Sequence, residues 1–493
     1  MDNMTYETNN RYAVNPLMQL TVLSDADVKR IHDTSMKVLE GTGIQVESKL
    51  AAEIFEQGGA RVDYNDDGAL VKIPETLIEK CISAAPKKPT FFGRTEDSDF
   101  YAGKGSTGFS TFGECVKILD RASGEAIETR KEDLAGVTRI CDYFDEIAVV
   151  ERACGSLDFA PPIQPLHNFE AMVKNTSKAI FIGAVSKENA RLMIDMARAV
   201  AGGDAQLRAR PFLNLFVCPV SPLSMGKDGC EITIEAARAG VGVAVIPMAL
   251  AGATSVVTLA GTAVNHNCEV LATLVLAQLA AAGTPFFYCS MSTIMDLKHM
   301  IATTGAPEHP LLGAAATKMA NLYGLPIWIG AGVSDSKLPD AQAGYEFGIG
   351  TLLGALAGAN IIYGAGALES CLLIDYAKLV MDCEALGFIR RILDGIRVDD
   401  DTLALDIIAA KGPKGDFLRE KHTFSHMREQ TPTKVFDRFT RDTWIKNGAR
   451  RADETAYARA DEIRKEHRAA PLPEGAEEAM AKIIADRTKE LGL

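Results

Sequence analysis

The sequence lacks an excess of positive charge. It holds 52 Lys and Arg against 65 Asp and Glu, which gives a net charge of −13. Nucleic-acid binding depends on clustered basic side chains that displace counterions from phosphates. The charge balance therefore argues against a DNA- or RNA-binding role, and we expect no nucleic-acid partner.

Long apolar runs are missing too. Residues 1–12 are polar and contain no apolar core of a secretory signal. The longest candidate for a membrane span, residues 270–283, is shorter than the roughly 20 residues that cross a bilayer, and turn signals flank it. We expect no membrane anchor and a cytoplasmic location.

Familiar metal and redox motifs are absent as well. The ten cysteines form no CxxC pair, and the eight histidines form neither HExxH nor a pair beside cysteines at zinc-ligand spacing. Cysteines scattered in this way are typical of small buried residues in a reducing compartment. We expect no metal site and no cofactor bound by this chain itself.

Signatures of covalent, phosphoryl and hydride chemistry are also lacking. The sequence has no GxSxG elbow, no phosphate loop and no GxGxxG after an early strand. We therefore predict no nucleophilic catalytic residue in the chain.

A repeated strand–helix rhythm is what the sequence does contain. Short β-branched or aromatic runs end in Gly, Ser or Pro, and an amphipathic helical stretch follows each run. The 493 residues leave room for a barrel of roughly 250 residues with additions at both ends. The predicted strands lie at 108–112, 147–153, 179–182, 212–217, 243–247, 285–288, 326–329 and 361–363.

Eight such units, without a cue for reversed strand order, most simply close into a parallel barrel. We predict an α/β fold with a (β/α)8 TIM barrel at residues 103–395. An N-terminal α/β extension at 1–102 and a C-terminal helical tail at 396–493 flank it. A doubly wound open sheet is the alternative, which the missing GxGxxG disfavours.

The additions carry their own signals. Acidic residues in the first turn of one helix, and turn residues between two short runs, fix their positions. We predict helices at 24–39, 48–57, 453–467 and 475–490, a strand at 69–73, and a hairpin at 115–130 that turns at 122–124.

The loops after the strands should carry the active site, since the reacting groups of such barrels lie at the carboxyl ends of the strands. These loops are rich in small residues, which indicates close backbone approach to a large or flat ligand, although Gly and Ser also simply punctuate loops. The same face offers aromatic rings and carboxylates, a combination that attracts onium cations. The candidates are Phe109, Phe112, Phe216, Tyr288, Tyr345, Glu114, Asp158, Asp335 and Glu369.

Structural roles compete for each of these residues. Side chains alternate between the two faces of a strand, so about half of the aromatics should only pack. The acids could equally cap helices or pair with basic side chains. Trp328, in the middle of a predicted strand, is predicted to be core.

Three segments resemble the trimethylamine:corrinoid methyltransferase superfamily. Residues 251–262 read AGATSVVTLAGT and run on to Asn265 and Glu269, residues 334–346 contain SDSK and DAQAGYE, and residues 218–223 read CPVSPL. The likeness extends over most of the chain. It implies the barrel fold and methyl transfer to the cobalt of a separate protein, so the expected partner is a cognate corrinoid protein that carries the cobalamin.

The sequence departs from the archaeal trimethylamine enzymes of this superfamily, which contain pyrrolysine in the loop near Ser334. No such residue occurs here. The departure makes the chain resemble the pyrrolysine-lacking branch, whose substrates include betaines. A quaternary ammonium already carries its charge and leaves as a neutral tertiary amine, so desolvation and in-line orientation suffice.

The resemblance and the loop positions together give a working mechanism. Aromatic and acidic side chains hold a small quaternary amine, glycine betaine first, while the corrinoid protein docks over the barrel mouth. Ser334, Gln342, Tyr345 and Glu346 orient the substrate or only the seventh loop. Backbone amides or serines donate hydrogen bonds to a betaine carboxylate. Four small residues are expected to leave room for the close approach of the corrin: Ser221, Gly332, Gly364 and Gly366.

Several readings stay open at this point. The donor could be carnitine, proline betaine or a tertiary amine such as dimethylglycine, and a non-catalytic onium-binding protein or an unrelated barrel lyase would share the fold. A lyase should show a metal or a Schiff-base lysine, but Lys178 precedes the third strand at the wrong end and is expected at the surface. A homo-oligomer is expected, with no interface assigned.

Overall fold

The computed structural model describes residues 12–87, 90–103 and 105–493. Most of the polar stretch 1–12, on which the expected lack of a secretory signal rests, lies outside these ranges. Within them, no helix is both long and apolar enough to cross a bilayer.

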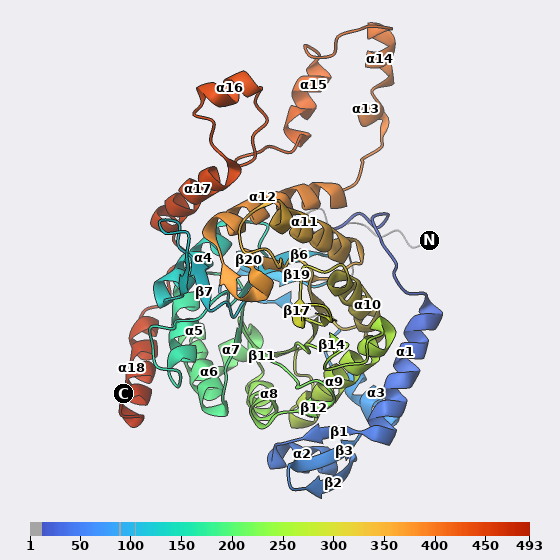
Figure 1. Cartoon of the computed structure of the whole chain (residues 1–493), viewed down its shortest axis with the longest axis vertical. Coiled ribbons are helices and arrows are strands. Elements are labelled where there is room, and N and C mark those ends of the chain that lie inside the picture. Colours follow the sequence, from blue (N-terminus) through green and yellow to red (C-terminus); the bar gives the residue numbers. More distant parts are fainter. Residues whose placement is uncertain (1–11, 88–89, 104) are drawn as a thin grey trace.

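Eight parallel strands form a barrel at the centre of the molecule (Figure 1). The first and second strands close the sheet, because the Ala148 amide donates to the Phe109 carbonyl at 2.8 Å and the Thr111 hydroxyl donates to the Glu151 carbonyl at 2.8 Å. All eight predicted strands and the predicted fold class are confirmed. The strands are β6 (Gly108–Thr111), β9 (Val150–Glu151), β10 (Ile180–Gly183), β11 (Leu213–Val217), β13 (Gly242–Val245), β15 (Phe286–Ser290), β18 (Ile327–Gly330) and β19 (Ile361–Ala365).

Helices surround the strands and take up their outward side chains. Residues such as Leu213, Val243 and Ile327 pack outward against the helices, whereas their neighbours point into the barrel. The helices are α4 (Lys131–Tyr143), α5 (Gln164–Asn175), α6 (Lys187–Ala201), α7 (Asp204–Ala209), α8 (Lys227–Ala239), α9 (Leu259–Ala280), α10 (Glu308–Tyr323), α11 (Ala341–Leu356) and α12 (Tyr376–Leu393).

The N-terminal extension packs on the outside of the barrel against α9. Its first helix begins where Ser24 accepts from the Asp27 amide and Asp27 returns the bond, a capping box that fixes the start. The predicted helices at 24–39 and 48–57 and the strand at 69–73 are present. The elements are α1 (Asp25–Lys37), η1 (Val38–Thr42), β1 (Ile44–Val46), α2 (Lys49–Gln57), β2 (Arg61–Asn65), β3 (Gly68–Lys72) and α3 (Glu75–Ala84), and β12 (Ser224–Met225) joins their sheet.

This packing explains the composition of α9, which is mostly apolar and is fully buried from Val270 to Gln278. The barrel covers one side of the helix, and α1, α2 and α3 cover the other. A helix with apolar residues all around needs such double cover in water. The run at 270–283 is therefore core rather than membrane span.

Aromatic side chains close the floor of the barrel. The short strands β4 (Thr90–Phe91) and β5 (Phe100–Tyr101) place two buried rings under it. Phe91 lies 4.8 Å from Phe287 and 5.5 Å from Phe181, ring centre to ring centre. The barrel interior is a packed aromatic core at this end, so access is from the other end.

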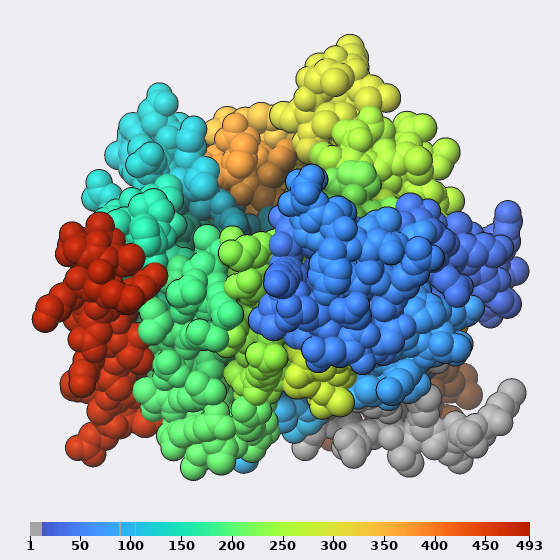
Figure 2. Space-filling model, turned by 90° about the horizontal axis from the view of Figure 1, so that it is seen from below, coloured from blue at the N-terminus to red at the C-terminus, as the bar shows by residue number. Residues whose placement is uncertain are grey.

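Hairpins rise from the opposite rim, as Figure 2 shows at its upper edge. One is the hairpin predicted at 115–130, in cyan, whose Gly124 amide donates back to the Asp120 carbonyl at 2.8 Å. Another, in yellow, rises on the other side, and the segment after β19 lies between them. The elements are β7 (Lys117–Leu119), β8 (Ala126–Glu128), β14 (Leu250–Ala251), β16 (Thr293–Asp296), β17 (Ile301–Thr303), β20 (Ala367–Leu368), η3 (Glu369–Cys371) and β21 (Leu373–Ile374).

The C-terminal residues form helices, as predicted, but they do not form one body. α17 packs on α12 and α4, and α18 packs on α6, while the segment before them projects away from the barrel (Figure 1). The elements are α13 (Asp400–Leu403), α14 (Leu405–Lys411), α15 (Lys421–His426), η4 (Met427–Glu429), α16 (Arg441–Lys446), α17 (Ala452–Glu466) and α18 (Ala476–Glu490). One further short helix, η2 (Glu96–Ser98), lies between β4 and β5 near the N-terminus.

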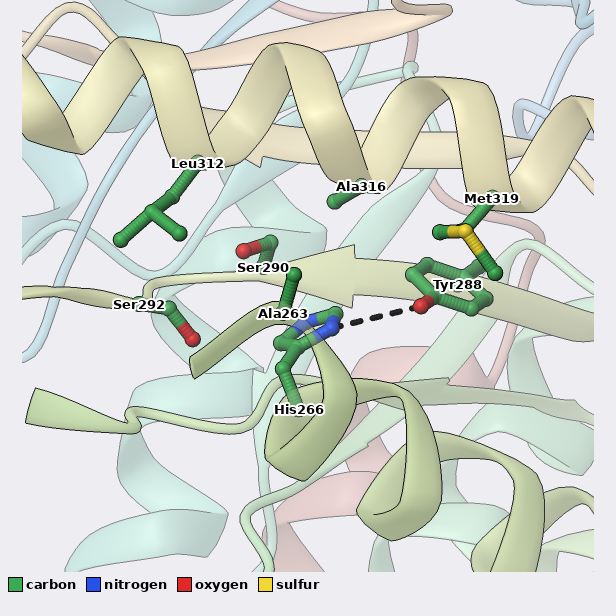
Figure 3. A pocket seen from close by; sticks show the side chains of 8 residues that line it. All are labelled: Ala263, His266, Tyr288, Ser290, Ser292, Leu312, Ala316 and Met319. Atoms are coloured by element: carbon green, nitrogen blue, oxygen red, sulfur yellow. Dashed lines mark hydrogen bonds between the residues drawn. The ribbon is translucent and has the colours of Figure 1, made fainter. Parts of the chain in front are cut away.

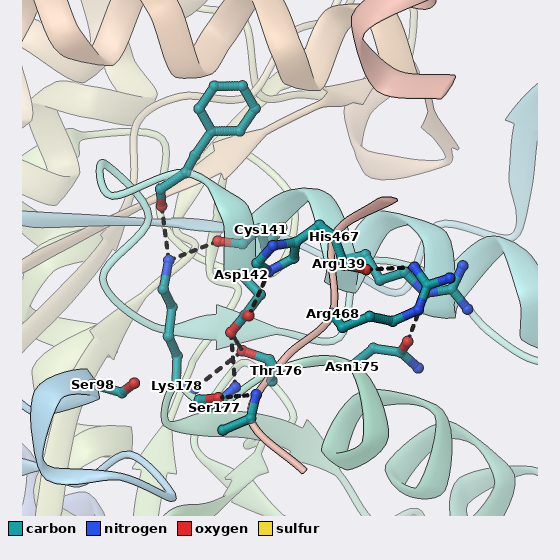
Figure 4. Close-up of polar contacts among 12 residues, drawn as sticks. Ser98, Arg139, Cys141, Asp142, Asn175, Thr176, Ser177, Lys178, His467 and Arg468 are labelled. Atoms are coloured by element: carbon teal, nitrogen blue, oxygen red, sulfur yellow. Dashed lines mark hydrogen bonds and ion pairs between the residues drawn. The ribbon is translucent and has the colours of Figure 1, made fainter. Parts of the chain in front are cut away.

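A polar cluster ties this tail to the floor side of the barrel (Figure 4). Asp142 accepts from the Thr176 hydroxyl, the Ser177 amide and His467, each at 2.8 Å. Lys178 is buried beside it and donates to the carbonyls at the end of α4, at 2.7 Å. The expectation of a surface lysine at this position is wrong, because the ammonium group caps a helix end.

Candidate functional site

The upper half of the barrel interior is lined by aromatic rings. Trp328 is fully buried, as predicted, and lies 4.2 Å from Phe181 and 5.5 Å from Phe216. Above them the partly exposed ring of Phe112 stacks on Tyr363 at 4.7 Å. Phe112 and Phe216, both predicted as pocket residues, therefore lie together at the inner end of the open side.

Glu151 adds a carboxylate to this aromatic wall. It is the last residue of β9, and its neighbour Val150 packs outward, so Glu151 points inward. Its residue is 5% exposed, and among the described residues its Oε2 has no hydrogen-bond partner. Burial first, and the charge of Glu114 second, raise the pKa of Glu151 well above its usual range, against the lowering effect of Arg152. An unpaired buried carboxyl group of this kind is a typical feature of functional sites.

An ion pair stands on the rim above Glu151. Arg152 and Glu114 approach at 2.5 Å, with the arginine largely buried and the glutamate largely exposed. The Nε of Arg152 has no partner among the described residues. Glu114 was predicted as a site residue, and the structure places it beside Phe112 in the loop after β6. The rim therefore offers a guanidinium group next to a buried carboxyl group.

Cys218 lies on the same wall, at the end of β11. Its side chain is exposed, but its surroundings desolvate the thiolate, and the charges of Glu114 and Glu151 also oppose it. Together they raise the pKa of Cys218 to about 12. The thiol is thus neutral at physiological pH, which makes it a poor nucleophile.

Backbone strain gathers around this mouth. Glu114, Val185 and Leu223 follow three different barrel strands and have φ values of 78°, 68° and 53°. Glu369, Ser370 and Cys371 follow β19 and are also left-handed. Non-glycine residues adopt this conformation at a cost of roughly 1–3 kcal/mol, and such residues cluster at functional sites.

The predicted residues of the seventh loop form a polar network that holds the loop. Glu346 accepts from the Ser334 hydroxyl at 2.6 Å, the Asp335 amide at 2.9 Å and Gln342 at 2.9 Å. Asp335 in turn accepts from the Ser370 hydroxyl at 2.6 Å and from Thr304. Hydrogen bonds of this kind hold the pKa of Asp335 below its usual range although burial raises it. These side chains position the loop between β18 and α11.

Two other predicted residues lie away from that network. Tyr345 is on the outer side of α11, with 70% of its surface exposed. Asp158 accepts from the Lys131 amide at 2.9 Å, at the start of α4. Asp158 is therefore a helix-capping acid, which is the competing role considered for the acids. Glu369 stays at the rim, partly buried, in the left-handed segment after β19.

Tyr288 does not face the barrel mouth, and its placement there is wrong. It lies on the outward face of β15, where its hydroxyl donates to Asn267 at 2.9 Å and lies 3.3 Å from His266. Phe109 is likewise outward. The register of a strand determines whether a side chain points into the barrel or outward, and the sequence pattern does not define that register for Tyr288 and Phe109.

A small cavity lies behind Tyr288, between β15, α9 and α10 (Figure 3). Burial lowers the pKa of His266 to about 4, so its ring is neutral. The cavity is on the helix side of β15. It is lined by Ala263, His266, Tyr288, Ser290, Ser292, Leu312, Ala316 and Met319.

Ser221 and the three predicted glycines have local structural roles. The Ser221 hydroxyl donates to Glu269 at 2.8 Å, and the Leu223 amide donates to the same carboxyl group at 2.9 Å. A Cβ on Gly364 would lie 2.2 Å from the carbonyl carbon of Gly332. A Cβ on Gly332 would meet Thr351 and Phe347, and one on Gly366 would meet Ile374 and Leu379. None of these missing side chains leaves a gap that faces the mouth.

One group of side chains in the described part of the chain has the spacing of metal ligands. Asp401, His422 and His426 offer atoms that all lie within 4.8 Å of one another. The group is in the projecting segment, not at the barrel mouth. It has no bearing on the chemistry of the mouth.

Glu151 and Arg152 are the residues that the loop-based reasoning missed. They lie within the predicted strand 147–153, whereas every acid predicted for the site follows a strand. Two charged residues at the end of an apolar run in a barrel strand were the available signal, because unpaired acids are rarely buried.

Comparisons with known proteins agree with this architecture. A family model described as trimethylamine methyltransferase (MTTB) matches residues 2–492. Trimethylamine methyltransferase MttB of Desulfitobacterium hafniense (strain DSM 10664 / DCB-2) is 43% identical over 96% of this chain and 95% of its own length. Glycine betaine methyltransferase of Desulfitobacterium hafniense (strain Y51) is 30% identical over 97% of this chain and 99% of its own.

Among solved structures, the hydroxylamine complex of MtmB superposes with a TM-score of 0.53. The alignment covers 92% of this chain and 90% of that one, at 10% sequence identity. This likeness bears on the fold alone.

Proposed function

The chain belongs to the trimethylamine methyltransferase (MTTB) family, and from this premise we propose that it moves a methyl group from glycine betaine to the Co(I) centre of a separate corrinoid protein. Methyltransferase activity follows from the family. The quaternary amine and the corrinoid partner are the proposed part.

The observation that carries the proposal is the unpaired Oε2 of Glu151 next to the ion pair of Arg152 with Glu114, at an aromatic mouth. A betaine has a quaternary nitrogen at one end and a carboxylate at the other. The carboxylate of Glu151 and the rings of Phe112 and Phe216 suit the nitrogen. The guanidinium group of Arg152 suits the carboxylate, in exchange for part of its contact with Glu114.

The reaction needs no nucleophile from this chain. The methyl group leaves nitrogen without the electron pair of the C–N bond, the pair stays on the amine, and the corrinoid substrate supplies the pair for the new bond to carbon. A positive nitrogen therefore becomes a neutral tertiary amine. The residues of the mouth bind the cation, remove its water and point one methyl group outward.

Trimethylamine is the second candidate, because a relative with that name is 43% identical. The absence of pyrrolysine from the sequence argues against it. Arg152 separates the two candidates, since trimethylamine has no carboxylate for it to bind.

The test is an anaerobic spectral assay with a Co(I)-reduced corrinoid protein and a panel of glycine betaine, carnitine, dimethylglycine and trimethylamine. Loss of the Co(I) absorption with glycine betaine, and loss of that activity in Arg152→Ala, would support the proposal. Activity with trimethylamine that Arg152→Ala leaves intact would favour the second candidate. No transfer from any donor, when a control methyltransferase works, would leave a binding protein.

A further inference from the structure

In the segment that follows α12, polar groups make the internal contacts and apolar side chains are exposed, which is the reverse of a folded domain. Residues 396–433, here called the arm, contain α13, α14 and α15, and none of these helices has a buried residue. The contacts that hold the arm together are polar, such as the pair of Lys411 with Glu420 and the bond from His422 to the Asp401 carbonyl at 3.0 Å. Its apolar side chains are on the outside.

The exposed apolar surface of the arm is large. Leu418 and Phe424 are 79% and 78% exposed. With roughly 100 Å² for each such side chain, the arm bares on the order of 1,000 Å², more than the largest apolar patch of a typical monomer. Its exposed apolar residues are Ile396, Val398, Leu403, Leu405, Ile408, Phe417, Leu418, Phe424 and Met427.

The arm is held firmly at its base. The Asn15 amide donates to the Leu393 carbonyl at 2.8 Å just before the arm begins. Where the arm returns, the carboxylate of Glu384 accepts from the amides of Lys434, Val435 and Phe436, at 3.1, 2.6 and 2.9 Å. The chain thus projects the arm from a fixed position, and in Figure 1 it points away from its own barrel.

A second uncovered apolar surface lies on α11. The helix Ala341–Leu356 contains one charged residue, Glu346, and its carboxylate turns inward to the loop of Ser334. The outer side exposes Tyr345 and Ile349, which are 70% and 64% accessible. α9 has a similar composition, and the N-terminal extension covers it; among the described residues no element of this chain covers the outer side of α11 in the same way.

Glycines on that outer side point to a neighbour. A Cβ on Gly344 or on Gly348 would meet nothing within 4 Å. Glycine in an exposed helix interior destabilises the helix by roughly 1 kcal/mol relative to alanine, unless it lets another backbone approach closely. Gly344 and Gly348 lie one turn apart, beside Tyr345 and Ile349.

We propose that the arm of one chain packs against α11 of a second copy, and that the exchange is reciprocal. Each copy has both surfaces, and its own arm projects away from its own α11. A two-fold arrangement uses both pairs and closes without leaving a free surface. The exposed apolar area of one arm is comparable to the roughly 800 Å² per partner that a specific protein–protein interface of standard size buries. This inference is independent of the proposed substrate.

The experiment compares three variants of the full chain by sedimentation and by hydrogen exchange. Leu418→Glu with Phe424→Glu changes only the arm, Ile349→Glu changes only α11, and Leu322→Glu on the outer side of α10 is the control, since it is also a half-exposed leucine. Because the substituted side chains are exposed, each variant should still fold, and the far-ultraviolet circular dichroism spectrum of each should match that of the wild type.

The wild type should sediment with twice the mass of the chain. The arm variant and the α11 variant should each raise the dimer dissociation constant at least about 100-fold, and the control should not. Amide exchange in α11 should become faster in the arm variant, which a purely local effect on the arm would not produce. A monomeric wild type, or a dimer that survives both variants with unchanged exchange in α11, would overturn the proposal. A monomer whose arm instead binds a corrinoid protein would overturn it as well.

Discussion

A buried carboxyl group without a partner is costly, and the barrel has placed one where it can meet a ligand. Leaving such a group unsatisfied destabilises a fold by roughly 1–3 kcal/mol. Glu151 lies at the inner end of the mouth, between the rings that line it and the ion pair on the rim. A cation that enters the mouth would remove this penalty, so the residue links ligand binding to protonation.

Binding of glycine betaine should release a proton from Glu151. Burial raises its pKa in the empty site, so the group keeps its proton to a higher pH than an ordinary glutamate does, and a bound quaternary nitrogen lowers that pKa again. Affinity should therefore rise with pH, at most tenfold per unit, until the pH exceeds the pKa of the empty site. Calorimetry in two buffers of different ionisation enthalpy, repeated at several pH values, should show proton release on binding in the wild type and none in Glu151→Gln.

The matched control for this measurement is Glu114→Gln, which removes an exposed carboxylate on the same rim. It should keep the proton release. Binding of the wild type without any dependence on the buffer would contradict the role assigned to Glu151.

Glu269 should make the stability of the chain depend on pH. Burial raises its pKa to about 7, against the bonds from Leu223, Ser221 and Asn265. The folded chain holds this proton more tightly than the unfolded chain, so the free energy of unfolding falls as pH rises from about 4.5 to about 7, by up to about 3 kcal/mol. Glu269→Gln stays neutral and should lack this fall.

Urea unfolding of both proteins at pH 5 and pH 8 measures the effect. For each protein, the free energy of unfolding at pH 8 is subtracted from that at pH 5. The difference between the wild type and Glu269→Gln in this quantity isolates Glu269 from all other titrating groups. An equal change in the free energy of unfolding in both proteins would mean that the Glu269 carboxyl group does not change its protonation in this range.

At the scale of elements, the repeating parts of the molecule were predictable and the contacts between them were not. Period and composition fix each strand, and closure of eight parallel strands follows from short right-handed connections. They do not fix which face of β15 carries Tyr288, because a shift of one residue turns the side chain to the other face. For the same reason the sequence pattern does not show that Glu151, inside a strand, points into the barrel, whereas the position of Phe112 and Glu114 just beyond a strand follows from the strand's end.

The floor of the barrel shows a further limit of sequence reasoning. Nothing local in residues 90–101 predicts that two short strands plug a barrel that begins later in the chain. Phe91 contacts Phe181, Phe287 and Trp328, which belong to three different strands. Only the closed barrel brings these rings together.

Removal of the plug should be strongly destabilising. Phe91→Ala leaves a cavity in the barrel interior, and such changes cost roughly 3–5 kcal/mol. Tyr101→Ala on the neighbouring strand removes an exposed ring and should cost much less. Denaturant unfolding of the two variants compares them; a loss of under about 1 kcal/mol in Phe91→Ala would show that the floor is not a packed part of the core.

At the scale of the whole molecule, polar side chains join segments that are far apart in the sequence. Arg94, from the N-terminal extension, donates to the Thr176 carbonyl at 2.8 Å and to the Ala470 carbonyl at 2.7 Å. The first hundred residues, the barrel and the tail therefore meet at one side chain.

Loss of this contact should loosen the tail before it affects the barrel. Hydrogen bonds of a charged group contribute roughly 1.5–3 kcal/mol, so Arg94→Ala should speed tryptic cleavage near Arg468 about tenfold or more. Arg61→Ala, which removes an exposed arginine on the extension, serves as the control. Cleavage at the wild-type rate in Arg94→Ala would place the anchoring of the tail elsewhere, for example at His467.

The closed floor of the barrel should also affect the order in which ligands bind and leave. A barrel that is closed at one end has a single entrance. A small donor and a macromolecule that docks over this entrance therefore cannot bind and dissociate independently. In the proposed reaction the donor would therefore load first, and the demethylated amine would stay in the barrel until the macromolecule departs. Steady-state kinetics should then be ordered, with an excess of the macromolecular acceptor blocking entry and slowing turnover.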